Sequence, residues 1–296
     1  MDKNQWLSYF RDKSNKEFVN IQEKAGDYKE QASRVNAVIG AAKEEAISKI
    51  LQEAETNQWG NDDILDAVLM ITYTADVVML ESRNRVWPYE YMTFTRRIGE
   101  LWEPFCKEAF RYSIRPLKTI EPPVFEKIQN KLVKKTEKYI SRLNVEDTVK
   151  RELLYYYKIP WTIVKSGGIK LELDLHFKQS GNHYNCDFKS GFSSNEKGNT
   201  NRLLMVASIY RLISSKEKMI LFVRQKEEDN NHYLQTLKNA GYWKIYCADN
   251  AYRKIMKFTG FDLRKWLDEN VLWEQDISEE FRKHLIKNDL LKYLTW

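Results

Sequence analysis

Residues 171–192, "LELDLHFKQSGNHYNCDFKSGF", contain two short runs in which apolar and polar residues alternate. A Ser-Gly-Asn segment separates the runs, and such segments are typical of tight turns. Because side chains on a strand point alternately to opposite faces, each run predicts one apolar face and one polar face. The stretch therefore predicts a β-hairpin with an unusually charged face. That face carries Glu172, Asp174, His176, Asn185, Asp187 and Lys189.

The turn fixes which residues of the two strands lie opposite one another. A glycine in the first central position suits a two-residue hairpin turn, so we predict the turn at Gly181–Asn182. This register places Asp174 opposite Lys189 and His176 opposite Asp187. The two aspartates then become diagonal neighbours on one face of the hairpin.

Two carboxylates this close repel each other, and a bound cation would offset the repulsion. Mg²⁺ binds through one or two carboxylates and keeps positions for water and phosphate oxygens. We therefore expect Asp174 and Asp187 to hold Mg²⁺, with the Phe188 carbonyl as a further ligand. Lys189 would orient the attacking water or stabilise the charged phosphate. The alternative is an exposed ribbon whose outer face is merely charged.

Composition limits the classes of protein that need consideration. The chain has 296 residues, of which 43% are hydrophobic and 30% charged, so a packed core is expected. Its net charge of +6 favours a polyanionic partner. Three separated cysteines and four histidines at no metal-ligand spacing argue against a disulfide framework and a zinc site. The sequence shows no membrane span or secretory leader, so we expect a soluble cytoplasmic protein.

The predicted elements change in kind along the chain. Residues 1–86 have helical periodicity and form a predicted helical N-terminal region. Residues 87–296 form the predicted core, with more helices at its C-terminal end. From residue 161 the expected order is β-β-β-α-β-α-β-α, and "WTIVKSG" (161–167) is its first strand. The fold class is thus predicted as α/β, a mixed sheet flanked by helices.

Asp174, twelve intervening residues and Asp187-Phe188-Lys189 resemble the PD-(D/E)xK motif of the restriction-endonuclease-like nucleases. The β-β-β-α-β order around the motif is similar to the core of that superfamily. Leu173 stands where the motif has proline, which leaves the first acid open between Asp174 and Glu172. We favour Asp174 because the predicted register brings it to Lys189.

The resemblance implies a Mg²⁺-dependent endonuclease that acts on double-stranded DNA, most like a Type II restriction enzyme and expected to be a homodimer. A glutamate on the helix before the sheet often reaches the metal in this superfamily. Glu100 is the better candidate here, because Pro104 disturbs the turn after Glu103. The loop after the catalytic lysine commonly meets the DNA backbone. Its candidate DNA-binding residues are Ser193, Ser194, Lys197, Asn199, Asn201 and Arg202.

Other interpretations stay open on the sequence alone. Within the same fold, the chain could be a nonspecific or structure-specific nuclease. From a different class, it could be a nucleic-acid-binding protein without catalysis. Glu100 could simply pair with Arg96 or Arg97 on its own helix, and residues 193–202 could be a solvated turn. The chain has no phosphate-binding GxxxxGK[ST] motif, which disfavours a nuclease coupled to an ATPase motor.

Overall fold

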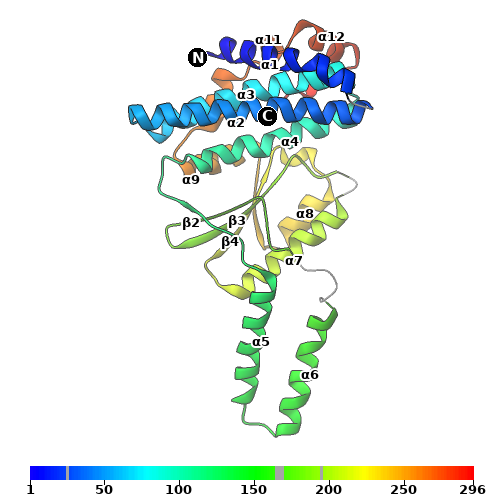
Figure 1. Cartoon of the computed structure of the whole chain (residues 1–296). Helices are drawn as coiled ribbons and strands as arrows, with labels where there is room; N and C mark the ends of the chain where they lie inside the picture. The colour runs from blue at the N-terminus through cyan, green and yellow to red at the C-terminus, as the bar shows by residue number, and fades with distance from the viewer. Residues whose placement is uncertain (25–26, 164–169, 194–195) are drawn as a thin grey trace. The chain divides into compact units, whose positions relative to one another are not determined.

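The computed structural model describes residues 1–24, 27–163, 170–193 and 196–296 (Figure 1). It contains helices and a five-stranded sheet, which confirms the α/β class. The chain divides into two compact units, and no boundary between them falls at residue 86. The C-terminal helices join the N-terminal ones in the helical unit, residues 1–117, 223–226 and 247–296, and the sheet unit comprises residues 118–222 and 227–246.

The helical unit is built around α3 (Asn61–Val86), which packs against α1, α2 and α4. Its segment "ILDAVLMITYTADVVML" is apolar on nearly every side, as is typical of a fully buried helix. Most residues between Leu65 and Val86 are buried. The other helices of this unit are α1 (Lys3–Lys24), α2 (Tyr28–Asn57), α4 (Tyr91–Arg111), α9 (Asp249–Thr259), α10 (Leu263–Asn270), α11 (Trp273–Asp276), α12 (Glu279–Lys287) and the 3-10 turn η2 (Leu291–Tyr293).

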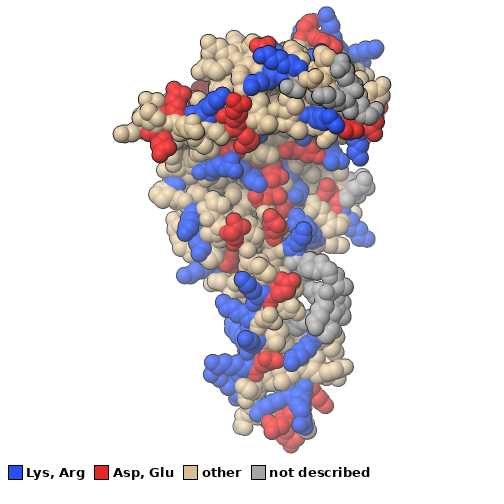
Figure 2. All heavy atoms as spheres, viewed as in Figure 1, with Lys and Arg blue, Asp and Glu red and all other residues tan. Residues whose placement is uncertain are grey.

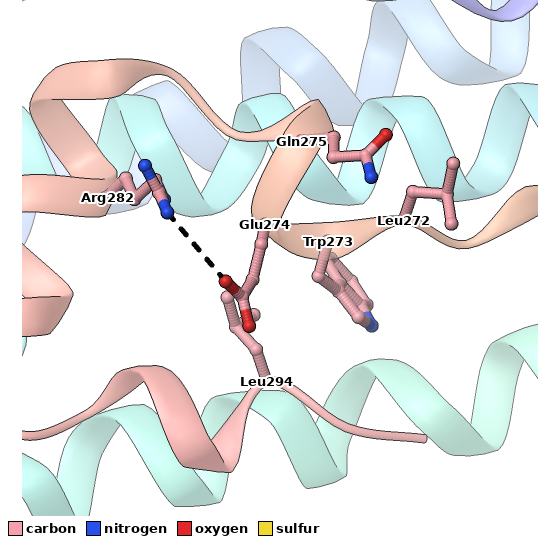
Figure 3. A pocket seen from close by; sticks show the side chains of 6 residues that line it. All are labelled: Leu272, Trp273, Glu274, Gln275, Arg282 and Leu294. Carbon is pink, nitrogen blue, oxygen red and sulfur yellow. Dashed lines mark ion pairs between the residues drawn. The ribbon is translucent and has the colours of Figure 1, made fainter.

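A surface hollow of about 610 Å³ lies beside α11 in the helical unit (Figure 3). Apolar side chains such as Leu272, Trp273 and Leu294 line it. Its charged groups face each other, since Arg282 Nη2 lies 3.9 Å from a Glu274 carboxylate oxygen. The hollow therefore offers little charge to attract a ligand. None of the described helices is long and apolar enough to cross a membrane.

The sheet unit contains a mixed sheet in which the strands follow one another in chain order. The β2–β3 hairpin forms its centre and provides the antiparallel pairing that alternation predicts. β1 pairs antiparallel with β2, so that Lys118 lies opposite Lys178. The elements of this unit are β1 (Lys118–Thr119), α5 (Phe125–Ser141), α6 (Asp147–Ile163), β2 (Leu175–Gln179), β3 (Asn182–Lys189), α7 (Lys197–Ile213), β4 (Glu217–Val223), η1 (Glu227–Asp229), α8 (His232–Asn239) and β5 (Trp243–Cys247).

The strand predicted at residues 161–167 is wrong where the structure describes it. Residues up to Ile163 continue helix α6, with Pro160 inside it, and residues 164–167 lie outside the described residues. A seven-residue run is too short to separate strand from helix periodicity. The strand beside β2 is instead β1, a two-residue segment in a stretch that contains several prolines.

Candidate functional site

The turn of the β2–β3 hairpin lies one residue earlier than predicted. Ser180 (φ 49°) and Gly181 (φ 76°) both have left-handed backbones, which is the geometry of a type I′ turn. Gln179 therefore pairs with Asn182, and His176 lies opposite Asn185 rather than Asp187. Continued past the start of β2, this register brings Asp174 level with Asp187 instead of Lys189. The division of side chains between the two faces is unchanged, because the pairing shifts by two residues.

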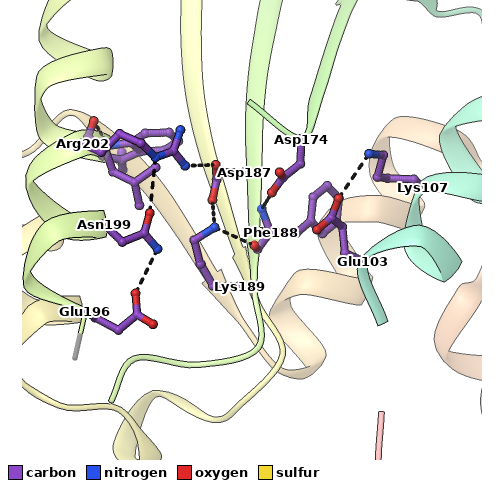
Figure 4. A network of polar contacts seen from close by, with 11 residues as sticks. Glu103, Lys107, Asp174, Asp187, Phe188, Lys189, Glu196, Asn199 and Arg202 are labelled. Carbon is purple, nitrogen blue, oxygen red and sulfur yellow. Dashed lines mark hydrogen bonds and ion pairs between the residues drawn. The ribbon is translucent and has the colours of Figure 1, made fainter. Parts of the chain in front are cut away.

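Asp187 is the most deeply buried acid of the predicted site, with no exposed surface. Its carboxylate forms an ion pair with Lys189, two residues on along β3 (Figure 4). Its other oxygen, Oδ2, accepts a hydrogen bond of 3.0 Å from Arg202 Nη2 on α7. Since an uncompensated buried carboxylate is costly, these two cations are what allow the ionised group to remain there.

Asp174, which directly precedes β2, contacts the same segment of β3. Its Oδ2 accepts a 2.7 Å hydrogen bond from the backbone N–H of Phe188 (Figure 4). Asp174 thus contacts the peptide that follows Asp187 in the chain. Glu172, the alternative first acid, is exposed, and of these two acids it is Asp174 that hydrogen-bonds Phe188.

Lys189 links the groups that were predicted to bind metal. Its Nζ contacts the Asp187 carboxylate and lies 3.1 Å from the Phe188 carbonyl oxygen. Two oxygen ligands of the predicted metal site therefore already converge on one cation. Within the described ranges, no cluster of three or more His, Cys, Asp or Glu could hold a metal. Two carboxylates with one carbonyl, completed by water, fit Mg²⁺ rather than a metal that needs a full protein cage.

The predicted DNA-binding loop is largely helical. Residues from Lys197 onward form the first turns of α7, so the loop interpretation of residues 197–202 is wrong. Arg202 points to Asp187, and Asn199 bridges Glu196 and Arg202 through bonds of 2.9 and 3.4 Å. The helix expected after the hairpin is α7, and it begins inside this segment. Ser193, Lys197 and Asn201 are exposed, whereas Ser194 lies outside the described residues.

Glu100 lies on α4 in the helical unit and pairs within its own helix. Arg96 Nε is 2.7 Å and Arg97 Nη1 3.4 Å from its carboxylate oxygens. This is the ordinary helix pairing that the spacing allows. The neighbouring acid, Glu103, pairs likewise with Lys107 at 3.2 Å. A role for Glu100 at the metal stays a prediction.

A hydrogen-bonded row continues from this site along the same face of the hairpin. His176 Nε2 accepts the N–H of Leu173 at 2.9 Å, so its Nδ1 carries the proton and donates to Asn185 at 2.8 Å. Asn185 in turn donates to Glu217 on β4 at 2.8 Å. His176 thereby holds the backbone next to Asp174. Alternation put His176 and Asn185 on the right face, but nothing in the sequence pointed to Glu217.

Acid should weaken the fold through His176. Burial lowers the pKa of His176, although the hydrogen bond to Asn185 and the charge of Glu172 partly oppose this. The unfolded chain therefore binds more protons than the folded chain just below the ordinary histidine pKa of about 6.5, and stability falls as pH drops through that window. We expect His176→Asn to flatten the decline in the urea midpoint between about pH 7.5 and 5.

His232→Asn is the matched control, because His232 is exposed on α8. It should keep the wild-type pH dependence. A His176→Asn profile parallel to that of the wild type would contradict a lowered pKa of His176 in the folded protein.

No protein-family model, curated protein or solved structure matches this chain. Its function must therefore be inferred from the geometry around Asp187 and from the sequence motif.

Proposed function

We propose that this protein is a Mg²⁺-dependent endonuclease of the PD-(D/E)xK type that cleaves double-stranded DNA, most like a Type II restriction enzyme. The observation that carries the proposal is the position of the Lys189 ammonium, against both the Asp187 carboxylate and the Phe188 carbonyl. An aspartate and a lysine two residues apart, on a hairpin followed by a helix, are what the motif requires. The proposed nuclease core is the sheet unit, which includes α7.

The residues divide into those that would hold the metal and those that would act beside it. Asp187 and the Phe188 carbonyl would offer oxygen ligands from β3, and Asp174, which accepts the Phe188 N–H, would offer a further one. When bound there, Mg²⁺ would polarise the scissile phosphate and make a bound water more acidic.

The Lys189 ammonium lies at the Asp187 carboxylate and the Phe188 carbonyl, where it can orient the attacking water and stabilise charge on the phosphate. Arg202 keeps the second oxygen of Asp187 fixed, which makes it a positioning residue. The resemblance further implies departure of the 3′-oxygen and a 5′-phosphate product. It also implies a homodimer that cuts both strands.

Incubation of purified protein with supercoiled plasmid tests the proposal directly. We expect discrete linear fragments with Mg²⁺ and unchanged plasmid when the metal is removed with EDTA. A smear with Mg²⁺ would identify a nonspecific nuclease of the same fold. Unchanged plasmid with a salt-sensitive gel shift would instead identify a binding protein without catalysis. Cleavage that persists in EDTA would contradict the metal requirement.

A further inference from the structure

The sheet unit contains a cavity of about 420 Å³ bounded by α5, the β2–β3 hairpin and the end of α7. This volume lies within the range of pockets that enclose small ligands. Apolar side chains from two helices form much of its wall, among them Ile128, Leu132, Leu212 and Ile213. The residues of the proposed nuclease site do not line this cavity, so it is a separate place on the molecule.

Four lysines are among the residues that line the cavity. Lys127, Lys131 and Lys135 are spaced four residues apart and so lie on one face of α5, and Lys178 joins them from β2. All four are exposed. The ion pairs found among the described residues involve none of them. Figure 2 shows Lys and Arg side chains gathered over α5.

Strand pairing adds further positive charge to this end of the hairpin. Lys118 lies opposite Lys178. Directly opposite residues project to the same face of a sheet, and like charges placed so are destabilising. A bound anion would remove that penalty.

The cavity lining also includes polar groups that hydrogen-bond one another. Glu217 receives hydrogen bonds of 2.8 Å from both His183 Nδ1 and Asn185 Nδ2. Glu121 is the other acid among the lining residues, so four lysines face two acids. The Tyr210 hydroxyl donates to the Leu171 carbonyl at 3.1 Å. A ligand would therefore meet apolar walls, a few hydrogen-bonding groups and an excess of ammonium groups.

We propose that this cavity binds a nucleoside polyphosphate. From Lys127 to Lys135 the lysine stripe extends for about 12 Å at the helical rise of 1.5 Å per residue, which suits a chain of phosphates better than a single one. Lysine is a common phosphate-binding residue, acting as a flexible point charge. The apolar part of the lining, which includes Leu132 and Ile213, would take the base.

Calorimetric titration of the full chain with ATP in EDTA tests the proposal, because the chelator keeps metal at Asp187 from contributing. We expect one saturable site. Lys131→Ala combined with Lys135→Ala should weaken ATP binding by about tenfold or more, because two ammonium groups that can pair with the phosphates are removed. Both lysines are exposed, so the variant should fold, as circular dichroism would verify.

Lys134→Ala combined with Lys138→Ala is the matched control. These lysines are exposed on the same helix and carry the same charge, but they do not line the cavity. The control should bind ATP within about twofold of the wild type, because distant surface charges are screened by salt. Equal weakening in both double variants, or no saturable ATP binding by the wild type, would overturn the proposal.

Tripolyphosphate and adenosine separate the two parts of the ligand. Each should bind more weakly than ATP by about tenfold or more, because each lacks either the apolar or the anionic half of the recognition. Tripolyphosphate binding as tight as ATP binding would refute a nucleoside site. Since binding is the only measurement, the result does not depend on whether the chain cleaves DNA.

Discussion

Replacing Lys189 with methionine should lower the rate of plasmid cleavage by about 10²–10⁴-fold, the range typical of losing a group that assists proton transfer. Methionine is similar in length but carries no charge, so it cannot orient a water or stabilise a charged phosphate. The fold should survive, because Arg202 still pairs with Asp187 at 3.0 Å. Gel densitometry over a time course in Mg²⁺ measures the rate.

Lys244→Met provides the control for this experiment. Lys244 is an exposed lysine on β5, in the same sheet, and its loss should leave the rate within about twofold, as is usual for surface substitutions away from a site. Thermal melting of both variants must show that they remain folded. A folded Lys189→Met protein that cuts at the wild-type rate would exclude the assigned role of Lys189.

The sequence correctly predicted which residues share a face of the hairpin, because side chains alternate along a strand and this alternation can be read from neighbouring residues alone. Asp174 and Asp187 were expected together, and Asp174 accepts a hydrogen bond from the peptide that follows Asp187. Register is harder, since moving the turn by one residue shifts every pair by two. Either of two turns was compatible with Ser-Gly-Asn, and the left-handed backbone of Ser180 decided between them.

Other features depended on contacts between distant parts of the chain. Arg202 was predicted to face DNA because it follows the motif, yet α7 turns it toward Asp187. Glu217 completes the His176–Asn185 row from a different strand. The segment "LKTIEPP" supplied β1 despite its prolines. In each case the local pattern was compatible with two outcomes, and packing in three dimensions selected one.

Local sequence patterns also could not predict how the chain divides into two units. The C-terminal helices belong with the N-terminal helices, and Asp276 shows how the two ends are joined. Its Oδ2 accepts hydrogen bonds from Tyr73 at 2.7 Å, Lys3 at 3.0 Å and the Leu272 N–H at 3.1 Å. Burial raises the pKa of Tyr73, so its hydroxyl stays protonated and donates.

Asp276→Ala should therefore destabilise the helical unit by about 3–5 kcal/mol, the usual cost of removing one partner from a buried ion pair. Tyr73 and the Leu272 N–H would lose their acceptor, and Lys3 would lose its counter-charge where only 21% of its side chain is exposed. Guanidinium unfolding followed by helical circular dichroism measures the loss. Two compact units can unfold in separate transitions, so the transition whose midpoint shifts to lower guanidinium concentration identifies the destabilised unit.

Asp268→Ala is the control that separates the effect of burial from the loss of an ion pair. Asp268 pairs with Arg264 at 2.6 Å in the same C-terminal segment, but 64% of its side chain is exposed. Exposed ion pairs contribute about 0–1 kcal/mol, so this variant should unfold close to the wild type. Similar losses in the two aspartate variants would mean that the contacts of Asp276 do not hold the C-terminal helices to α1 and α3. A large loss confined to Asp276→Ala would show that one buried carboxylate joins the two ends of the chain.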